Sequence, residues 1–427
     1  MSTPRTVVTP LPVMWWRGLG SLTRSGSAGE GLSWALYDFA NTIFSFAIVS
    51  YAMSLWAIRL LGEAQGQLAF TIAFSASVGL NALVSPVLGA MSDRVGRRKG
   101  FLFVFTAICV VATMVIGFVD IGLGLLAFAI ANFAYQAALI YYDALLPDVS
   151  RRETQGRLSG IGVALGYLGS IVSGLLFKLT TDDAGDSTVA SFLLIGSLFA
   201  IFALPLFLRV RETGVRGRFR MTDAVRSWSQ LRASVRHANE SPGLLRFIIG
   251  RFFYSDPINT AIVVMSAFAT QAVGFSSGEA LNILLGLIVV AVLASFGWGI
   301  LVDRWGPKRT LLLVLGSWTA GLLLLGLWLA PLPFLIGGAL LGSGLGGVAV
   351  TDRLLLLRLA PAERVGEMFG LYGLAGKFSA VIGPLLYGGI VASLQPTLGQ
   401  FAYQVAVLSL LALMVVGFAI VRTLPET

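Results

Sequence analysis

The chain has 427 residues, of which 56% are hydrophobic and only 12% are charged, and its mean hydropathy is +0.84. Soluble domains carry about 25% charged residues, so water is excluded as the main solvent of this chain. The formal charge of +9 at pH 7 does not indicate nucleic-acid binding, because the basic residues lie between apolar stretches and do not gather on one soluble face.

Cysteine and histidine are too scarce for a metal centre or a disulfide framework. Cys109 is the only cysteine and lies within an apolar stretch, and His237 is the only histidine. One residue of each kind cannot supply a pair of thiolates or a cluster of imidazoles within one chain. We therefore expect no metal, no cofactor, no catalytic residue and no enzymatic activity.

Apolar stretches long enough to cross a bilayer recur along the chain. A transmembrane helix needs about 20 predominantly apolar residues, and twelve such stretches fit between short polar breaks. The sequence thus predicts an all-α integral membrane protein of twelve transmembrane helices. The predicted spans cover residues 33–61, 68–91, 100–119, 121–146, 158–180, 189–208, 244–271, 279–302, 309–330, 332–358, 367–394 and 399–422.

The polar breaks differ in charge between the two sides of the membrane. Those on the side of the N-terminus carry most of the basic residues, namely Arg94, Arg97, Arg98, Lys99, Arg151, Arg152, Arg157, Arg304, Lys308, Arg309 and Arg364. Cytoplasmic loops are rich in Lys and Arg, so we expect both termini in the cytoplasm, with residues 1–30 as a cytoplasmic tail. Arginine-rich usage and short loops favour a bacterial cytoplasmic membrane.

The longest polar break, residues 209–243, is basic and divides the chain into an N-terminal bundle (31–208) and a C-terminal bundle (244–427). Within it, apolar residues recur at near-helical spacing, at Val225, Trp228, Leu231 and Val235. This pattern is typical of a helix that lies on an anionic membrane surface. A solvated linker helix explains it equally well.

Three pairs of similar segments relate the two bundles. The segment from Gly89 to Lys99 contains Gly-x-x-x-Asp-Arg-x-Gly, and the same pattern returns from Gly299 to Arg309, 210 residues later. Two further pairs are Asp38-Phe-Ala-Asn41-Thr42 with Asp256-Pro-Ile-Asn259-Thr260, and Gly160 and Gly166 with Gly370 and Gly376. Matches in the same order predict two parallel repeats about an axis along the membrane normal.

The paired Gly-x-x-x-Asp-Arg-x-Gly loops resemble the signature loop of the major facilitator superfamily. A finer resemblance, to the branch of autophagy-related vacuolar amino-acid effluxers and their bacterial relatives, runs through segments in both bundles. These segments are Trp34-Ala-Leu-Tyr-Asp38-Phe-Ala-Asn41, Leu145-Leu-Pro-Asp148, Gly160-Ile-Gly-Val-Ala-Leu-Gly-Tyr-Leu-Gly169, Arg251-Phe-Phe-Tyr-Ser-Asp256 and Phe369-Gly-Leu-Tyr-Gly-Leu-Ala-Gly-Lys377. The resemblance implies the major facilitator fold, with spans one, four, seven and ten lining a central cavity.

Carboxylates inside the spans are the first candidates for proton coupling. A charged side chain at the centre of a span costs about 2.5 to 3.5 kcal/mol on insertion scales, so each one needs a partner, water or a function. Asp38 and Asp256 are followed one helical turn later by Asn41 and Asn259, and the resemblance implies that both pairs face the cavity. Asp38 is our first candidate and Asp256 the second. Alternatively, Asp256 pairs locally with Arg251, and the asparagines serve as interhelical contacts.

A second set of charges lies nearer the cytoplasmic ends of the spans. At the offset of 210 residues, Asp143 corresponds to Arg353, so an ion pair between the two bundles could close the cytoplasmic mouth. The alternative is that both side chains reach into interfacial water. Lys377 lies deeper, within the eleventh span. It is expected either to neutralise Asp352 or Asp256 when substrate is absent or to bind an anionic substrate group.

The repeated loops predict a cytoplasmic latch. Gly89 and Asp93 share one helix face, as do Gly299 and Asp303, so each aspartate can meet the N-terminus of a neighbouring helix. Arg97 and Arg309 are expected to bind the same carboxylates. The remaining residues of the two loops are Arg94, Gly96, Arg304 and Gly306.

These residues together predict a secondary transporter. We expect a monomer that moves a small-molecule solute, amino acids among the candidates, across a lipid bilayer by alternating access, with protons as the coupling ion and export as the direction. A multidrug efflux antiporter is one alternative, and a transport-dead sensor on the same fold is another.

Overall fold

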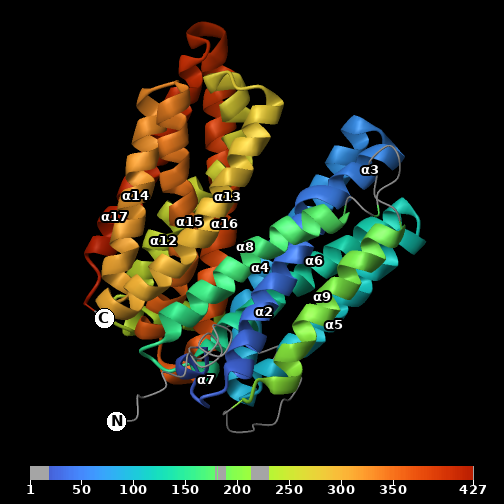
Figure 1. Ribbon diagram of the computed structural model, residues 1–427, viewed down its shortest axis with the longest axis vertical. Coiled ribbons are helices and arrows are strands. Elements are labelled where there is room, and N and C mark those ends of the chain that lie inside the picture. Colours follow the sequence, from blue (N-terminus) through green and yellow to red (C-terminus); the bar gives the residue numbers. More distant parts are fainter. Residues whose placement is uncertain (1–18, 178–179, 181–188, 213–229, 427) are drawn as a thin grey trace, which may run out of the picture.

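The computed structural model describes residues 19–177, 180, 189–212 and 230–426, and apart from one isolated bridge the described part is helices and connecting loops (Figure 1). In the first half the elements are α2 (Ala28–Phe44), the π-helix η1 (Ser45–Ala52), α3 (Met53–Leu61), α4 (Glu63–Val95), α5 (Arg98–Val115), η2 (Ile116–Phe118), α6 (Ile121–Ala144), α7 (Leu146–Val149), α8 (Gln155–Phe177) and α9 (Val189–Arg209). In the second half they are α11 (Gln230–Glu240), α12 (Leu244–Ala267), the π-helix η4 (Phe268–Val273), α13 (Ser277–Trp305), α14 (Pro307–Leu327), α15 (Pro331–Leu359), η5 (Ala362–Arg364), α16 (Val365–Leu398) and α17 (Phe401–Arg422).

Within the residues that the structure describes, each of the twelve predicted spans coincides with a helix. Eleven helices among the described residues are long and apolar enough to cross a membrane. The first of them joins α2, η1 and α3, and the corresponding helix of the second half joins α12 and η4. The α12 helix, which carries Arg246, Arg251 and Asp256, is not among the eleven. The all-α membrane fold is thus confirmed, while the count of twelve membrane spans stays a prediction.

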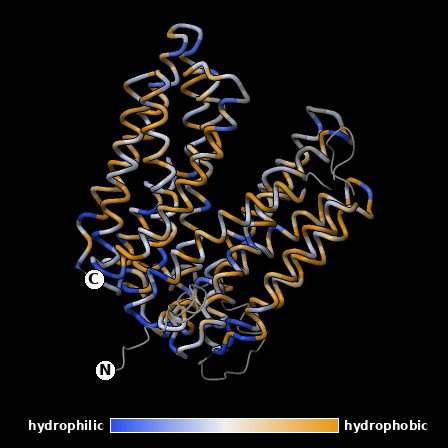
Figure 2. Tube along the Cα trace, in the orientation of Figure 1, coloured by the Kyte–Doolittle hydropathy of each residue, from blue (hydrophilic) through white to orange (hydrophobic). Residues whose placement is uncertain are grey.

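The two halves form bundles that meet at one end and diverge toward the other (Figure 1). The marked C-terminal end lies toward the end where the bundles meet (Figure 1). Hydrophobic residues follow the lengths of the helices, and hydrophilic stretches gather near helix ends and loops (Figure 2). This distribution suits helices that cross a hydrocarbon layer and end in water.

Two long-helix pairs make most of the contact between the halves. The α4 helix packs along α16, and α8 packs along α13, with smaller contacts of α15 with α8 and of α16 with α6. Glycines allow this approach: a Cβ on Gly89 would lie 1.9 Å from the carbonyl oxygen of Gly366, and a Cβ on Gly299 would lie 2.7 Å from that of Gly156. At 210 residues, Gly89 corresponds to Gly299 and Gly156 to Gly366, so both contacts follow the predicted repeat.

The linker helix α11 packs on protein and bridges the halves. It contacts α4 of the first half and α12 and α16 of the second, and His237 lies 3.1 Å from Glu367 through its Nδ1. Ser234 and Ala238 are buried, whereas Val235 is 41% exposed. One face of α11 is therefore buried on protein and another is exposed, and the membrane-surface helix and the solvated linker helix both stay predictions. Val225 and Trp228, and the side chain of Leu231, lie outside the described residues.

Gly89→Ala should destabilise the contact between the halves. The new methyl group meets backbone atoms of α16, which cannot move aside as a side chain can, and overpacking of this kind costs about 1–3 kcal/mol. We expect the unfolding midpoint of the purified protein to fall. Gly79→Ala, on the same helix with nothing within 4 Å of its would-be Cβ, is the matched control. Equal midpoints for both variants would contradict the assigned packing.

Candidate functional site between the two halves

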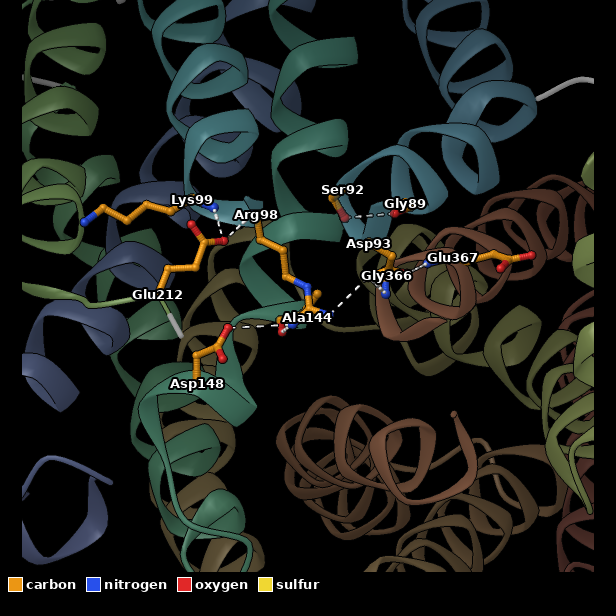
Figure 3. A network of polar contacts seen from close by, with 10 residues as sticks. All are labelled: Gly89, Ser92, Asp93, Arg98, Lys99, Ala144, Asp148, Glu212, Gly366 and Glu367. Carbon is orange, nitrogen blue, oxygen red and sulfur yellow. Dashed lines mark hydrogen bonds and ion pairs between the residues drawn. The ribbon is translucent and has the colours of Figure 1, made fainter. Parts of the chain in front are cut away.

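Asp93 of α4 binds the first turn of α16 in the other half. Its carboxylate accepts hydrogen bonds from the backbone amides of Gly366 (3.0 Å) and Glu367 (2.8 Å) (Figure 3). The first amides of a helix have no partner within the helix, and they carry the positive end of its dipole. Asp93 thus caps a helix that lies more than 270 residues away in the sequence.

Asp303 makes the equivalent contact in the opposite direction. Its carboxylate accepts hydrogen bonds from the backbone amides of Gly156 (2.7 Å) and Arg157 (3.0 Å), in the first turn of α8. All three residues stand 210 positions from their counterparts in the Asp93 contact. Two carboxylates therefore tie the halves together by one repeated interaction, which we call the paired latch.

The arginines that bind these carboxylates differ from those expected. Arg98, not Arg97, pairs with Asp93 at 3.0 Å, because α5 begins at Arg98 while Arg97 precedes it and is exposed. Arg157 pairs with Asp303 at 2.9 Å. Arg309 instead lies 3.4 Å from Glu426. The prediction that Arg97 and Arg309 bind the two aspartates is wrong.

The other residues of the repeated loops shape the helix ends. Gly96 ends α4 with a φ of 62° and Gly306 ends α13 with a φ of 81°, which residues with a Cβ rarely adopt. Arg304 is exposed. The side chain of Arg94 lies outside the described residues.

Arg98 and Glu212 extend the network around Asp93 (Figure 3). Arg98 donates to the carbonyl of Ala144 at 3.0 Å, and the Glu212 carboxylate accepts from the backbone amides of Arg98 and Lys99. Burial raises the pKa of the Glu212 carboxyl, and these amides oppose part of that rise. Sequence reasoning missed Glu212, although Glu426, beside Lys308 at 3.4 Å, occupies the equivalent place in the second half.

Arg353 of α15 reaches into the first half and meets two carboxylates. Its Nε lies 2.8 Å from Oδ1 of Asp143, and one terminal nitrogen lies 3.7 Å from Oδ2 of Asp38. The other donates to Ser159 at 3.0 Å. The sequence offered an Asp143 to Arg353 pair as one of two alternatives, and the structure has that pair. It also places Asp38 on the same guanidinium, which was not anticipated. Asp38, Asp143 and Arg353 are called the acidic triad below.

The neighbouring residue on α15, Asp352, stays within the second half. Its carboxylate accepts from Arg251 at 2.5 Å and from the Tyr254 hydroxyl at 2.7 Å. The Arg251 guanidinium also stacks on the Tyr372 ring, 3.6 Å from its centroid. Arg251 is thus neutralised by Asp352 and not by Asp256.

Asp256 lies away from these charges. It is 2% exposed, and its Oδ1 accepts from the Gly383 amide of α16 at 2.7 Å. Asn41 is likewise buried, at 5% exposure. Asp256 and Asn41 do not line the cavity described next, so the expectation that both Asp/Asn pairs face it does not match the structure.

A cavity of about 590 Å³ lies between the halves. Its polar lining comes from η1, α6, α12 and α16, and its aromatic lining from α4, α6 and α16. The polar side chains are Ser45, Ser50, Asn132, Gln136, Asp143, Arg251, Asn259 and Lys377, and the aromatic ones are Phe74, Tyr135, Phe369 and Tyr372. Of the acidic triad, Asp143 lines this cavity, and Asp38 and Arg353 lie behind it.

Lys377 crosses from the second half to α4 of the first. Its ammonium donates to Oδ1 of Asn81 and, at 3.3 Å, to the Ser85 hydroxyl. The expectation that Lys377 neutralises Asp352 or Asp256 is wrong for this conformation. Both of its partners are neutral.

Solved structures identify the fold as that of the major facilitator superfamily. The chain superposes on the human organic anion transporter MFSD10 with a TM-score of 0.73 at 15% identity, covering 92% of this chain and 99% of that one. The sugar transporter FucP, solved in the outward conformation, gives 0.68 at 15% identity, covering 94% and 98%. Likeness at this identity establishes the fold alone, and the fold is that of a transporter class.

Comparison of the sequence with known families gives a narrower assignment than the fold does. Residues 58–426 match the model of the vacuole effluxer Atg22-like family, and the chain belongs to that family of major facilitator transporters. It is 27% identical over 417 residues to the MFS-type transporter YxiO of Bacillus subtilis, covering 92% of this chain and 94% of the relative. It is 26% identical over 300 residues to autophagy-related protein 22 of Eremothecium gossypii, covering 61% and 58%. The chain is therefore a multi-pass membrane transporter.

Asp303→Ala should weaken the paired latch. Loss of a carboxylate cap costs about 1 kcal/mol, which changes the ratio of two conformations about fivefold. The distance distribution between spin labels on Arg97→Cys and Arg309→Cys, which lie outside the latch contacts, reports the separation of the halves at the end where the bundles meet. In Asp303→Ala we expect the population with the longer distance between the labels to increase.

Asp120→Ala provides the matched control. Asp120 also caps a helix, through the amides of Gly122 (2.9 Å) and Leu123 (3.1 Å), but within one half. It should leave the distance distribution unchanged. An unchanged distribution in Asp303→Ala would instead refute the latch.

Proposed function

We propose that this protein is a proton-coupled secondary transporter that exports a small polar solute, amino acids among the candidates, by alternating access. The observation that carries the proposal is the acidic triad, two carboxylates that share one guanidinium beside a cavity between the halves. The family description, vacuole effluxer, supports export.

The triad has one negative charge in excess. Asp38 and Asp143 carry two charges when ionised, and Arg353 supplies only one of opposite sign. An unmatched charge within a span is costly, so one proton shared by the two carboxylates stabilises the triad. Asp143 lines the cavity, which gives that proton a path to water.

Alternating access needs contacts that form on one side at a time. The paired latch joins the halves at the end where the bundles meet, and the halves diverge at the other end (Figure 1). If the basic loops at the joined end face the cytoplasm, the structure corresponds to an outward-facing state. Opening to the cytoplasm would break both aspartate caps and the Asp143 to Arg353 pair.

The remaining parts of the proposal follow from the family and the sequence. We place the protein in the cytoplasmic membrane of a bacterium, because the relative that matches over 92% of this chain is bacterial. We further propose that it acts as a monomer, since the cavity is formed within one chain.

A multidrug efflux antiporter is the second candidate. Four aromatic side chains line the cavity, and aromatic surfaces bind amphipathic compounds of varied shape. The charged groups beside them suit a polar solute better. A transport-dead sensor would bind a ligand in the same cavity without moving it.

Asp143→Asn should abolish gradient-driven transport. The variant leaves one carboxylate for one guanidinium, so the triad is neutral without a proton. In proteoliposomes with an imposed pH gradient, screened with a panel of amino acids and other small solutes, we expect accumulation to fall at least about tenfold. Asp38→Asn should act in the same way. Exchange of labelled for unlabelled solute without a gradient should persist in Asp38→Asn, because Asp38 does not line the cavity.

Asp256→Asn is the matched control within the spans. Its carboxylate accepts a backbone amide and faces neither the triad nor the cavity, so gradient-driven accumulation should remain. Accumulation that ignores both the gradient and the two triad variants would refute proton coupling. Binding without any flux would favour the sensor.

A further inference from the structure

Three charged side chains line the cavity between the halves, and two of them already have a partner of opposite charge. Asp143 pairs with Arg353, and Arg251 pairs with Asp352. Lys377 has no carboxylate within ion-pair distance among the residues that the structure describes; the acceptors recorded for it there are Asn81 and Ser85. The charge on Lys377 is therefore available to a ligand.

The two neutral acceptors hold the ammonium at a fixed place. Asn81 is itself anchored, because its amide nitrogen donates to the carbonyl of Phe133 at 2.9 Å. Ser85 donates to Oδ1 of the same Asn81 at 2.9 Å. Both acceptors belong to α4, so Lys377 is positioned across the boundary between the halves. Neutral acceptors orient an ammonium without cancelling its charge.

The surface of α16 around Lys377 leaves room for a ligand. Gly373, Gly376 and Ala380 line the cavity on the same helix. A Cβ on Gly373 would lie 3.9 Å from the Lys377 ammonium, with nothing nearer, and a Cβ on Gly376 would lie 2.9 Å from the Arg251 guanidinium. The Arg251 guanidinium therefore packs on Gly376, while the space beside Gly373 is open as far as the Lys377 ammonium.

We propose that Lys377 forms a subsite for a carboxylate group of the transported solute, at the end of the cavity where its charge has no carboxylate partner among the described residues. The ammonium can form a charge-assisted hydrogen bond with the ligand while Asn81 and Ser85 keep it oriented. The subsite rests on the proposed transport function, and it assigns the end of the cavity at which the acidic group of the solute binds.

The test is ligand binding to the full-length purified protein in lipid nanodiscs. Thermal stabilisation is measured with L-amino acids, with the corresponding amino-acid amides, and with neutral sugars and organic cations. We expect stabilisation by one or more carboxylates and at least tenfold weaker binding of the matching amide. Lys377→Met should remove the preference for the carboxylate, and Lys377→Arg should restore part of it.

Lys308→Met is the control, because Lys308 lies 3.4 Å from Glu426 and outside the cavity; it should bind ligands as the wild type does. The subsite is overturned if no carboxylate stabilises the protein, or if the amides bind as well as the acids, or if Lys377→Met keeps the preference. Failure of the transport proposal is a separate result, since carboxylate binding that depends on Lys377 can persist without gradient-driven flux.

Discussion

Two aspartates, one in each half, accept the free amides at the start of a helix that belongs to the other half. Asp93 binds the first turn of α16, and Asp303 binds the first turn of α8. A helix start inside a protein needs such partners, and in this fold each half supplies them to the other. The close glycine contacts of α4 with α16 and of α8 with α13 depend on this arrangement, because the caps and the glycines lie on the same stretches of helix. Since the caps are reversible hydrogen bonds, the halves can separate here without unfolding.

The α15 helix distributes charge between the halves. Asp352 and Arg353 are adjacent, and adjacent residues on a helix point about 100° apart. Asp352 turns to Arg251 within its own half, whereas Arg353 turns to Asp38 and Asp143 in the other. Asp352 thus neutralises Arg251, and Arg353 offsets one of the two carboxylate charges of the triad.

The repeat was enough to predict the fold and the positions of the latch aspartates, because a duplicated pattern at one offset constrains two places at once. The side chains that pair with these aspartates, with Asp38 and with Lys377 were not predictable from the sequence. Arg98 replaces Arg97 because a one-residue shift at the start of α5 turns a side chain by about 100°, and Arg157 lies outside the repeated loop. Asp38 was predicted to be functional because it is a carboxylate within a span, but its partner Arg353 is more than 300 residues away. The neutral partners of Lys377, Asn81 and Ser85, carry no charge pattern that a sequence could reveal.

The charges around the cavity also bear on the direction of transport. Asp38, Asp143 and Asp352 balance Arg251, Arg353 and Lys377, so the set is neutral overall, with a negative excess at the triad and a positive excess at Lys377. A solute whose carboxylate binds Lys377 and whose ammonium approaches Asp143 competes with the proton for the same excess charge. Binding of solute and proton is then mutually exclusive, as exchange of one for the other requires. A solute with a carboxylate but no ammonium would instead favour binding of the proton. Its carboxylate would neutralise the positive excess at Lys377, and the proton would neutralise the negative excess at the triad. In the transport cycle proposed above, the amino group of the solute is thus the feature that would allow solute to exchange for a proton.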